Sequence, residues 1–227
     1  PTLDNFKQQI LEKQKQPLNR KVLVAALNKQ YSGLETTQLV KENIESLTSE
    51  NTFTVATGHQ LCLFTGPLYF IYKIISTINL AEKLKSEYPE YNFVPIYWMA
   101  TEDHDFEEVN HVHLFGKTLT WEQEEKGGVG AISTKTLEDL FEELKPILGD
   151  SENASDLYDL LSDAYLGNVD LASATRSLVN SLFFKYGLVI LDANTKSLKQ
   201  EKLRQIDRIR IQQRKRLKQD LCRQDRC

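Results

Sequence analysis

The sequence predicts an α/β fold with a parallel sheet at its core and a mostly helical insertion. Two apolar segments, 53–57 and 94–100, have the character of strands, and each stops abruptly at polar residues. A long helical pattern at 67–84 separates them, which is typical of a βαβ unit whose crossover helix packs on the sheet. Of the 227 residues, 41% are apolar, which suffices for a packed core.

The N-terminal part is predicted to be helical and to cover the sheet. Residues 3–15 and 36–47 have polar-rich amphipathic patterns that suit surface helices. The first core strand follows at 53–57. The second begins at Val94, after a turn around Pro89.

The helix at 67–84 is the expected crossover between these two strands. Thr65 is expected to cap its N-terminus, and Pro67 suits the first turn, where a backbone N–H would have no partner. We expect the apolar face of this helix to pack on the sheet. That face contains Ile71, Ile75 and Ile78.

The second strand is followed by a predicted β-hairpin and then by the insertion. Segments 111–114 and 118–121 form the hairpin strands, with a turn near Gly116. A glycine-rich segment, 127–130, opens the insertion. Its three helices are predicted at 137–147, 153–165 and 171–186, and the last of them leads into a further core strand at 188–191.

These elements divide the chain into five predicted segments. They are an N-terminal helical cover at 1–52, the first half of the core at 53–126, the helical insertion at 127–186, the next core strand at 187–198 and a basic tail at 199–227.

The tail differs from the rest of the chain in charge. The net charge of the chain is −4, yet residues 199–227 contain eleven basic and four acidic residues. Two interpretations stay open: a solvated helix with a loose apolar stripe, or a foreign sequence appended to the chain. A run of charge alone is weak evidence for nucleic-acid binding, so we expect no nucleic-acid partner.

Composition indicates the compartment. No run approaches the ~20 apolar residues that cross a bilayer, and the N-terminus lacks the pattern of a secretory signal. Three cysteines, Cys62, Cys222 and Cys227, are too few and too scattered for a disulfide framework. We therefore expect a cytoplasmic protein with no membrane partner. The first residue, Pro1, suggests that a leading segment is missing.

The polar residues that end the first strand are candidates for a ligand site, because ligands bind beyond the carboxyl ends of parallel strands. Gly58 permits close backbone approach, and His59 and Gln60 follow it directly. Thr65 offers a neutral polar contact besides its expected capping role. Lys73 either lies along the helix surface or faces the site. Cys62 stands among apolar residues and is expected to be a buried thiol.

The second strand ends in a run of titratable residues, Glu102, Asp103, His104 and Asp105. We expect like charges to displace at least one pKa in this run. His104 between two aspartates could bind a carboxylate, act as a general acid, or serve as the base for an attacking amine. The alternative is structural: Asp103 or Asp105 caps the start of a helix.

A metal site is the competing interpretation of the histidines. His111 and His113 are two apart on a predicted strand, so their rings share a face, and Asp103 or Asp105 could complete a set for a metal-dependent hydrolase. The spacing is loose, and no cysteine pair or His-Glu-x-x-His helix supports it. We expect no metal.

Asp192 ends the strand at 188–191, where an acidic residue either binds a sugar hydroxyl or caps a loop. The phosphate-binding Walker motif and the Gly-x-Gly-x-x-Gly fingerprint are both absent from the sequence. A P-loop kinase and an ordinary NAD enzyme are therefore not expected.

Several separated motifs, in order, resemble one known family. They are Thr57-Gly58-His59-Gln60, Thr65-Gly66-Pro67-Leu68-Tyr69, Trp98 with Glu102-Asp103-His104-Asp105-Phe106, Asn110-His111 and Gly187-Leu188-Val189-Ile190-Leu191-Asp192. The chain resembles the cysteine-adding enzymes of bacillithiol biosynthesis over residues 20–198. The resemblance implies a Rossmann-like core related to class I aminoacyl-tRNA synthetases. It also implies a helical coiled-coil region, most of which is expected to be missing here because family members are much longer.

The resemblance implies a ligase that joins the carboxyl group of cysteine to the amine of glucosaminyl-malate. By relationship alone it also implies ATP as a cofactor and a homodimer for the full-length enzyme. The catalytic candidates are His59, Asp103, His104 and Asp105. The substrate-binding candidates are Gly58, Gln60, Thr65, Gly66, Tyr69, Lys73, Glu102, Asn110 and Asp192. His59 resembles the second histidine of the class I His-x-Gly-His signature, whose first histidine is absent here. We expect this short chain to be inactive alone, and the alternatives are the metal-dependent hydrolase and a non-catalytic remnant of the ligase.

Overall fold

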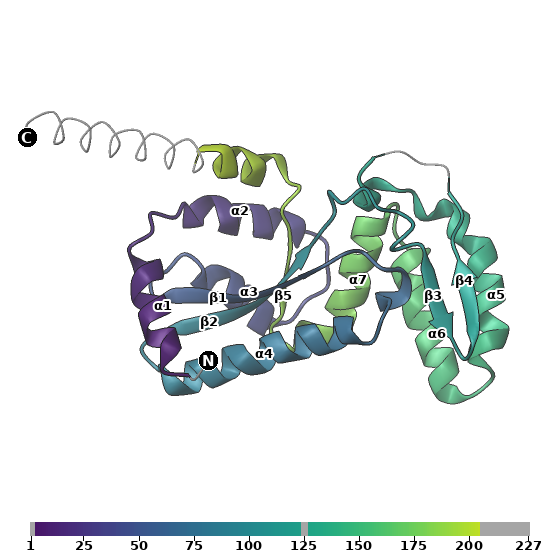
Figure 1. Cartoon of the computed structure of the whole chain (residues 1–227), viewed down its shortest axis with the longest axis horizontal. Helices are drawn as coiled ribbons and strands as arrows, with labels where there is room; N and C mark the ends of the chain where they lie inside the picture. Colours follow the sequence, from purple (N-terminus) through teal and green to yellow (C-terminus); the bar gives the residue numbers. More distant parts are fainter. Residues whose placement is uncertain (1–2, 124–126, 205–227) are drawn as a thin grey trace, which may run out of the picture.

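The core of the computed structural model is a three-stranded parallel sheet (Figure 1). The structure describes residues 3–123 and 127–204. Strands β1 (Thr52–His59), β2 (Asn92–Met99) and β5 (Val189–Asp192) lie in the order β1-β2-β5. His59 pairs with Met99, which in turn pairs with Asp192. The carboxyl ends of all three strands therefore meet at one edge, as the α/β prediction requires.

Helices cover both faces of the sheet. One face carries Tyr97, Met99 and Ile190, and packs against α4 (Tyr69–Glu87) and α7 (Leu171–Phe183). The other face packs against α2 (Arg20–Gln30) and α3 (Gln38–Ser46), while α1 (Asn5–Gln14) lies against the far end of α4. Helix α2 was not predicted. Its apolar residues form one continuous run, 22–27, instead of the spaced pattern of an amphipathic helix, and three of them, Val24, Ala26 and Leu27, are buried.

The crossover helix begins later than predicted. Its N-cap is Leu68, which makes no side-chain capping bond, so the capping role expected for Thr65 is wrong. Phe64 and Thr65 have positive φ angles of 51° and 74° in the 3-10 turn η1 (Leu63–Thr65), which turns the chain before the helix can start. Gly66 follows at φ 60°, and a Cβ there would lie 2.4 Å from Cys62 Cβ.

The buried face of α4 also differs from the prediction. Phe70, Ile74 and Ile78 face the core, whereas Ile75 is 39% exposed. Of the three predicted residues, Ile78 is buried and Ile71 is partly buried against the same core, so only Ile75 is wrong. The aromatic ring of Phe70, which also packs edge-on against Tyr97, was left out of the predicted stripe.

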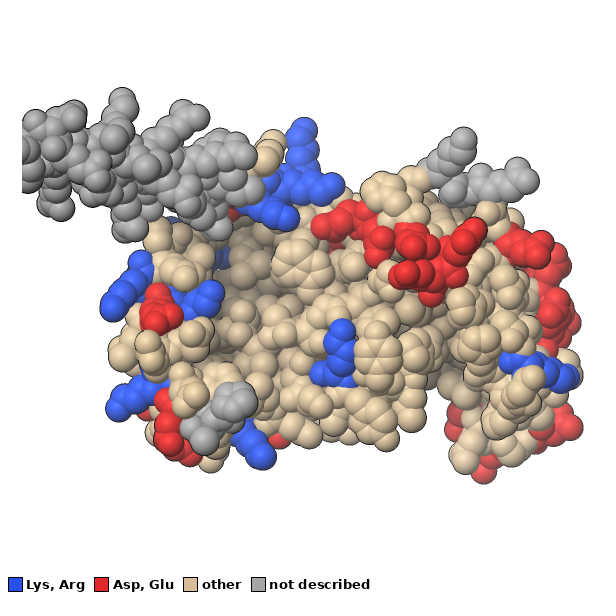
Figure 2. All heavy atoms as spheres, viewed as in Figure 1, with Lys and Arg blue, Asp and Glu red and all other residues tan. Residues whose placement is uncertain are grey.

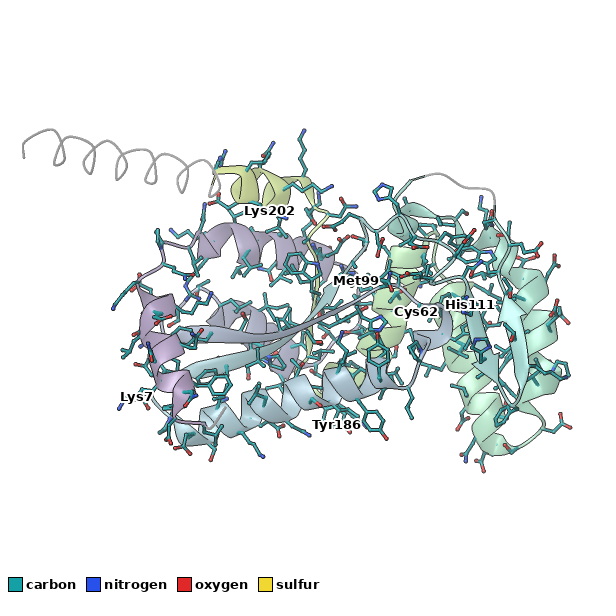
Figure 3. The ribbon with its side chains drawn as sticks, viewed as in Figure 1. Lys7, Cys62, Met99, His111, Tyr186 and Lys202 are labelled. Carbon is teal, nitrogen blue, oxygen red and sulfur yellow. The ribbon has the colours of Figure 1, made fainter. Side chains whose placement is uncertain are left out.

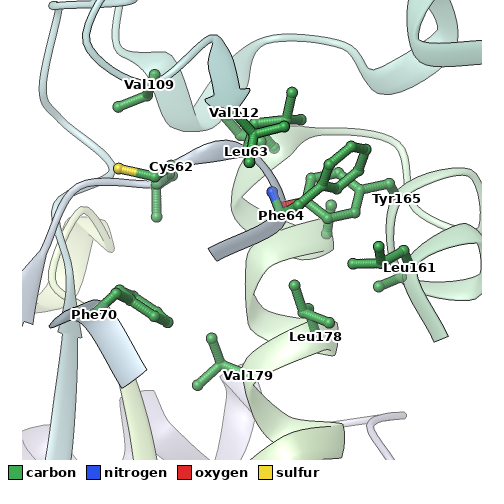
Figure 4. Packing of buried hydrophobic residues seen from close by; sticks show 14 of the residues in the cluster. Cys62, Leu63, Phe64, Phe70, Val109, Val112, Leu161, Tyr165, Leu178 and Val179 are labelled. Carbon is green, nitrogen blue, oxygen red and sulfur yellow. The ribbon is translucent and has the colours of Figure 1, made fainter. Parts of the chain in front are cut away.

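The insertion shares a hydrophobic core with the sheet (Figure 4). The predicted hairpin, β3 (His111–Leu114) with β4 (Lys117–Thr120), precedes the insertion and contributes to the same core. The insertion itself consists of short 3-10 turns at Val129–Ala131, Thr134–Leu137 and Phe184–Tyr186 and of the helices α5 (Glu138–Leu148), α6 (Glu152–Tyr165) and α7. Phe64 packs edge-on against both Phe141 and Tyr165, and its backbone N–H donates to the Tyr165 hydroxyl over 2.9 Å. The loop after β1 is therefore held by the insertion.

Residues 196–204 are helical and lie over α2, where Figure 3 labels Lys202. This helix contains the end of the predicted segment 187–198 and the start of the predicted tail. Glu201 is only 7% exposed and accepts a 3.2 Å hydrogen bond from Asn19. The prediction for residues 205–227 lies outside the described residues. Within the described ranges, no helix combines the length and apolar character needed to cross a membrane.

Candidate active site

His59 is the last residue of β1 and lies almost fully inside the protein, with 9% of its surface exposed. Its ring packs at 5.1 Å against both Tyr69 and Phe70, the first two residues of α4. The helix that crosses back over the sheet therefore sets the position of this imidazole.

The hydrogen bond of His59 defines its tautomer. Nδ1 lies 3.0 Å from the backbone oxygen of Gln60, which can only accept, so Nδ1 carries the proton. Burial lowers the pKa of His59. The hydrogen bond to the Gln60 carbonyl opposes this in part, and the positive charge of Lys73 lowers the pKa further. A neutral ring with a protonated Nδ1 leaves Nε2 as an acceptor, and this buried atom has no hydrogen-bond partner among the described residues.

Lys73 lies one turn along α4 from the same site. Its ammonium group donates to the backbone oxygen of Gly58 and lies 5.6 Å from the centre of the Tyr69 ring. The predicted alternative in which Lys73 faces the strand end is therefore the one observed. Tyr69 itself is half exposed, so its ring separates His59 from solvent.

Gln60 connects the first strand end to the acidic loop that follows β2. Its side-chain Nε2 donates to Asp103 Oδ2 over 3.0 Å and to Glu108 Oε2 over 2.5 Å. This hydrogen bond from Gln60 lowers the pKa of Asp103, with smaller contributions from the backbone N–H groups of His104 and Asp105. Asp103 is therefore held as a carboxylate.

The expectation that like charges displace a pKa in this loop is not met at Asp103, because its pKa moves down rather than up. Asp103 Oδ1 accepts from the backbone N–H of His104 at 2.8 Å, and Asp105 accepts from Glu108 at 3.4 Å. These are turn contacts, since no helix starts here. Figure 2 shows the acidic side chains gathered on the surface over this loop.

His104, Glu102 and Asp105 are exposed on the same loop. Their side chains are free to meet a ligand, and Asp103 and His104 line a shallow hollow together with Phe106. Of the four predicted catalytic residues, the structure brings three together here, while His59 joins them through its neighbour Gln60.

Cys62 is a buried thiol, as predicted, with 7% of its surface exposed. Burial raises its pKa, which disfavours the reactive thiolate. Its sulfur lies 3.8 Å from His59 Nδ1 and so helps to fix the imidazole.

Asp192 belongs to a second group of contacts at the end of β5. Its carboxylate accepts a 2.6 Å hydrogen bond from Thr101 and one of 2.9 Å from the backbone of Asn194. Gln30 holds its backbone through bonds of 2.6 Å and 3.1 Å, and Arg176 donates to the same Gln30 side chain. Asp192 therefore caps the loop that follows β5, while its role in binding a sugar hydroxyl stays a prediction.

The loop after β2 is packed against the start of the insertion. The backbone N–H groups of Val129 and Gly130 donate to the carbonyls of Asp103 and Thr101 over 2.7 Å and 3.1 Å. A Cβ on Gly130 would lie 2.8 Å from Thr101 Cβ, so only glycine permits this approach.

The remaining candidates lie elsewhere. Asn110 donates to the Trp121 carbonyl over 3.1 Å and supports the hairpin. Thr65 and Gly66 form the turn beside Cys62. His111 and His113 share a strand face as predicted, with ring centres 5.3 Å apart, but His111 bonds Asn110 and His113 bonds Thr118. In the part of the chain that the structure describes, no three His, Cys, Asp or Glu side chains gather as a metal site.

Four residues complete these contacts without having been predicted as site residues: Gln30, Thr101, Glu108 and Arg176. Glu108 was considered only as an acidic residue suited to the dipole of a helix that does not form here. Only Arg176 could have been singled out from the sequence, because it is a basic residue within the otherwise apolar and neutral helix α7. The partners of the others lie up to 162 residues away, and nothing in a local pattern indicates them.

Comparison with known proteins agrees with this geometry. A family model described as Bacillithiol biosynthesis BshC, N-terminal Rossmann-like domain, matches residues 1–226. The chain belongs to the BshC family. The resemblance and the Rossmann-like fold expected from the motifs are thus confirmed.

Longer BshC relatives carry the name "Putative cysteine ligase BshC". The protein from Flavobacterium psychrophilum is 57% identical over 204 residues, which are 88% of this chain and 38% of the relative. The Cytophaga hutchinsonii protein is 44% identical over 201 residues, covering 88% and 37%. The Bacillus cereus protein is 30% identical over 206 residues, covering 87% and 38%. This BshC chain therefore spans less than two fifths of the length of these relatives.

Proposed function

We propose that this chain supplies the first half of a ligase active site that joins the carboxyl group of cysteine to the amine of glucosaminyl-malate. The observation that carries the proposal is the group at the end of β1: a neutral imidazole with a free Nε2, an ammonium group and a helix N-terminus. The name of the relatives supports the reaction class.

An anion suits the helix side of this site. The N-terminus of α4 has no side-chain cap and carries the positive end of the helix dipole, and Lys73 adds a full charge beside it. A carboxylate of the substrate or a phosphate of ATP fits these donors. ATP, when bound, supplies the energy that converts the cysteine carboxyl into an acylating group.

His59 is the candidate base. Amide formation consumes an unprotonated amine. A neutral imidazole can take the proton of the substrate ammonium group, which frees the amine lone pair that attacks the activated carboxyl carbon. Burial and the charge of Lys73 both lower the pKa of His59, which keeps Nε2 unprotonated at neutral pH. Tyr69 covers the ring, so the ligand reaches Nε2 once that exposed side chain moves.

The acidic loop suits the ammonium group of a substrate. Asp103 is ionised and fixed by Gln60, and the exposed Asp105 and Glu102 add negative charge beside it. The two ends of an amino acid therefore have complementary groups.

The remaining parts of the proposal come from the resemblance. They are a homodimeric full-length enzyme with a coiled-coil region and a cytoplasmic location. The non-catalytic alternative differs from the ligase in one respect, since it binds substrate without turning it over.

The test is an assay of a chimera in which this chain replaces its matching region in the Flavobacterium psychrophilum relative. Cysteine, ATP and glucosaminyl-malate are supplied, and the coupled thiol is detected by mass. We expect product from the chimera and none from this chain alone. A folded chimera that makes no product would refute the proposed ligase, and equal turnover by this chain alone would show that the rest is dispensable.

A further inference from the structure

The start of α4 exposes apolar side chains on one side of the helix. Leu68 is 65% exposed and Tyr72 is 61% exposed, and Tyr69 and Ile75 are exposed as well. Residues three or four apart in a helix are neighbours on its surface, so these four side chains form one continuous patch, which we name the α4 patch. Figure 2 shows a mostly uncharged surface over the start of α4. Exposed apolar patches mark sites for a ligand or a partner.

The α4 patch borders the candidate active site, because Tyr69 belongs to both. The centre of its ring lies 5.1 Å from the centre of the His59 ring and 5.6 Å from the Lys73 ammonium nitrogen. Tyr72 directly precedes Lys73 and follows Tyr69 by about one helical turn. A ligand that rests on the patch therefore has the proposed base and a positive charge within reach.

The two tyrosines define the chemistry of a ligand for this patch. Each ring has a flat apolar face and a polar hydroxyl at its rim, and neither hydroxyl has a hydrogen-bond partner among the described residues. A purely apolar partner would bury both hydroxyls unpaired, which costs free energy. A pyranose ring is complementary instead. The negative face of an aromatic ring attracts the C–H groups on the face of the sugar, whose hydroxyls lie around its edge.

We propose that Tyr69 and Tyr72 form the platform on which the sugar ring of glucosaminyl-malate stacks. This role rests on the proposed function and deepens it, because it assigns the amino sugar to the α4 side of the site and leaves cysteine to the acidic loop. The Lys73 ammonium group has three N–H donors and uses one on the Gly58 carbonyl, so two remain for a malate carboxylate. The sugar amine approaches His59 Nε2 as the Tyr69 ring turns away from the imidazole.

The experiment uses this chain and follows the ligand by NMR. A proton held over an aromatic ring shifts upfield, so the C–H signals of the sugar report stacking directly. We expect the sugar protons of glucosaminyl-malate to shift upfield on binding and to receive saturation transferred from the aromatic protons of the protein. Malate alone, which lacks the sugar, is expected to leave the Tyr72 ring signals unchanged. Sugar protons that stay unshifted, with or without binding, would overturn the proposal.

Three variants separate the ring of Tyr72 from its hydroxyl and from exposure alone. Tyr72→Ala removes the ring and is expected to weaken glucosaminyl-malate binding by about tenfold, as for the loss of one aromatic contact. Tyr72→Phe keeps the ring and is expected to bind more tightly than Tyr72→Ala. Phe115→Ala, at an exposed ring on the turn between β3 and β4, is the matched control and is expected to bind as the parent does. Equal affinity of the parent and Tyr72→Ala contradicts stacking.

These measurements are distinguishable from the chimera assay, because the upfield shifts report binding and not turnover. A chimera that couples cysteine while the sugar protons stay unshifted would refute the platform and keep the ligase. Shifted sugar protons beside an inactive chimera would keep the platform and refute the ligase. Tyr72 signals that change with the concentration of this chain, and not with the sugar, would assign the α4 patch to a second copy instead.

Discussion

The side-chain amide of Gln60 lies 3.0 Å from the carboxylate of Asp103, although 43 residues separate them in the sequence. This hydrogen bond joins the end of β1 to the loop after β2. The same Gln60 nitrogen also donates to the carboxylate of Glu108 over 2.5 Å. The two polar groups that the sequence places after separate strands therefore form one site.

Replacement of Gln60 by leucine is expected to raise the pKa of Asp103 toward its usual value of 3.8, because the hydrogen bond that stabilises the carboxylate is lost. The measurement is an NMR titration of the Asp103 side-chain carbonyl in the parent and the variant. Gln123→Leu is the control, because this half-buried glutamine lies near the same loop and its side chain donates to Thr136 rather than to Asp103. An unchanged Asp103 titration in Gln60→Leu would remove Gln60 from this role.

The lowered pKa of His59 predicts how stability depends on pH. The folded protein resists protonation of this ring, whereas the unfolded chain binds the proton at its usual pKa of 6.5. Relative to His59→Gln, the parent is expected to lose stability as the pH falls below 6.5 and down to the folded-state pKa. Above pH 6.5 the difference between the two proteins stays constant. Urea unfolding across pH 5 to 8 gives both curves, and parallel curves throughout would contradict the buried neutral ring.

Thr101→Val removes the 2.6 Å hydrogen bond to Asp192 and leaves this partly buried carboxylate short of a donor. We expect the free energy of unfolding to fall by about 1–3 kcal/mol. Thr101→Ser keeps the hydroxyl group and is expected to lose less. The account of this strand end is wrong if the valine variant is as stable as the serine variant in chemical denaturation.

The chain is expected to bind zinc below one ion per molecule. His111 and His113 face each other, but their Nδ1 atoms already bond Asn110 and Thr118, and no third ligand lies near them in the described residues. Elemental analysis of purified protein measures the ratio. One zinc per chain that disappears in His111→Ala would restore the hydrolase interpretation.

Regular elements were predictable where apolar segments end at polar residues. The strands β1, β2 and β5 and the hairpin fall within a few residues of their predicted bounds. Strands β2 and β5 are buried on both faces and so need nearly continuous apolar runs, whereas burial alternates along β1 and the hairpin strands. The start of α4 was not predictable. It depends on the positive φ of Phe64, which the distant Tyr165 holds in place.

The sequence allowed us to predict which residues belong to the candidate site, but not which hydrogen bonds join them. His59, Gln60 and Asp103 follow strand ends, and general rules for parallel sheets place ligands there. Asp192 also lies at a strand end, yet its hydrogen bonds come from within the protein. Thr101 donates to its carboxylate, and Gln30 donates to its backbone oxygen. Such pairings depend on which loops meet in space, and a single sequence carries no record of that.

The most direct test of the central claim uses the chimera with the Flavobacterium psychrophilum relative and two histidine variants. His59→Gln removes the proposed base, and His113→Gln changes an exposed histidine on the hairpin. Coupling of cysteine to glucosaminyl-malate is measured by product mass, with the thermal midpoint of each protein recorded beside it. The account predicts that His59→Gln loses at least a hundredfold in turnover, as for a general base, while it remains folded and His113→Gln matches the parent. Equal turnover by a folded His59→Gln chimera would contradict it.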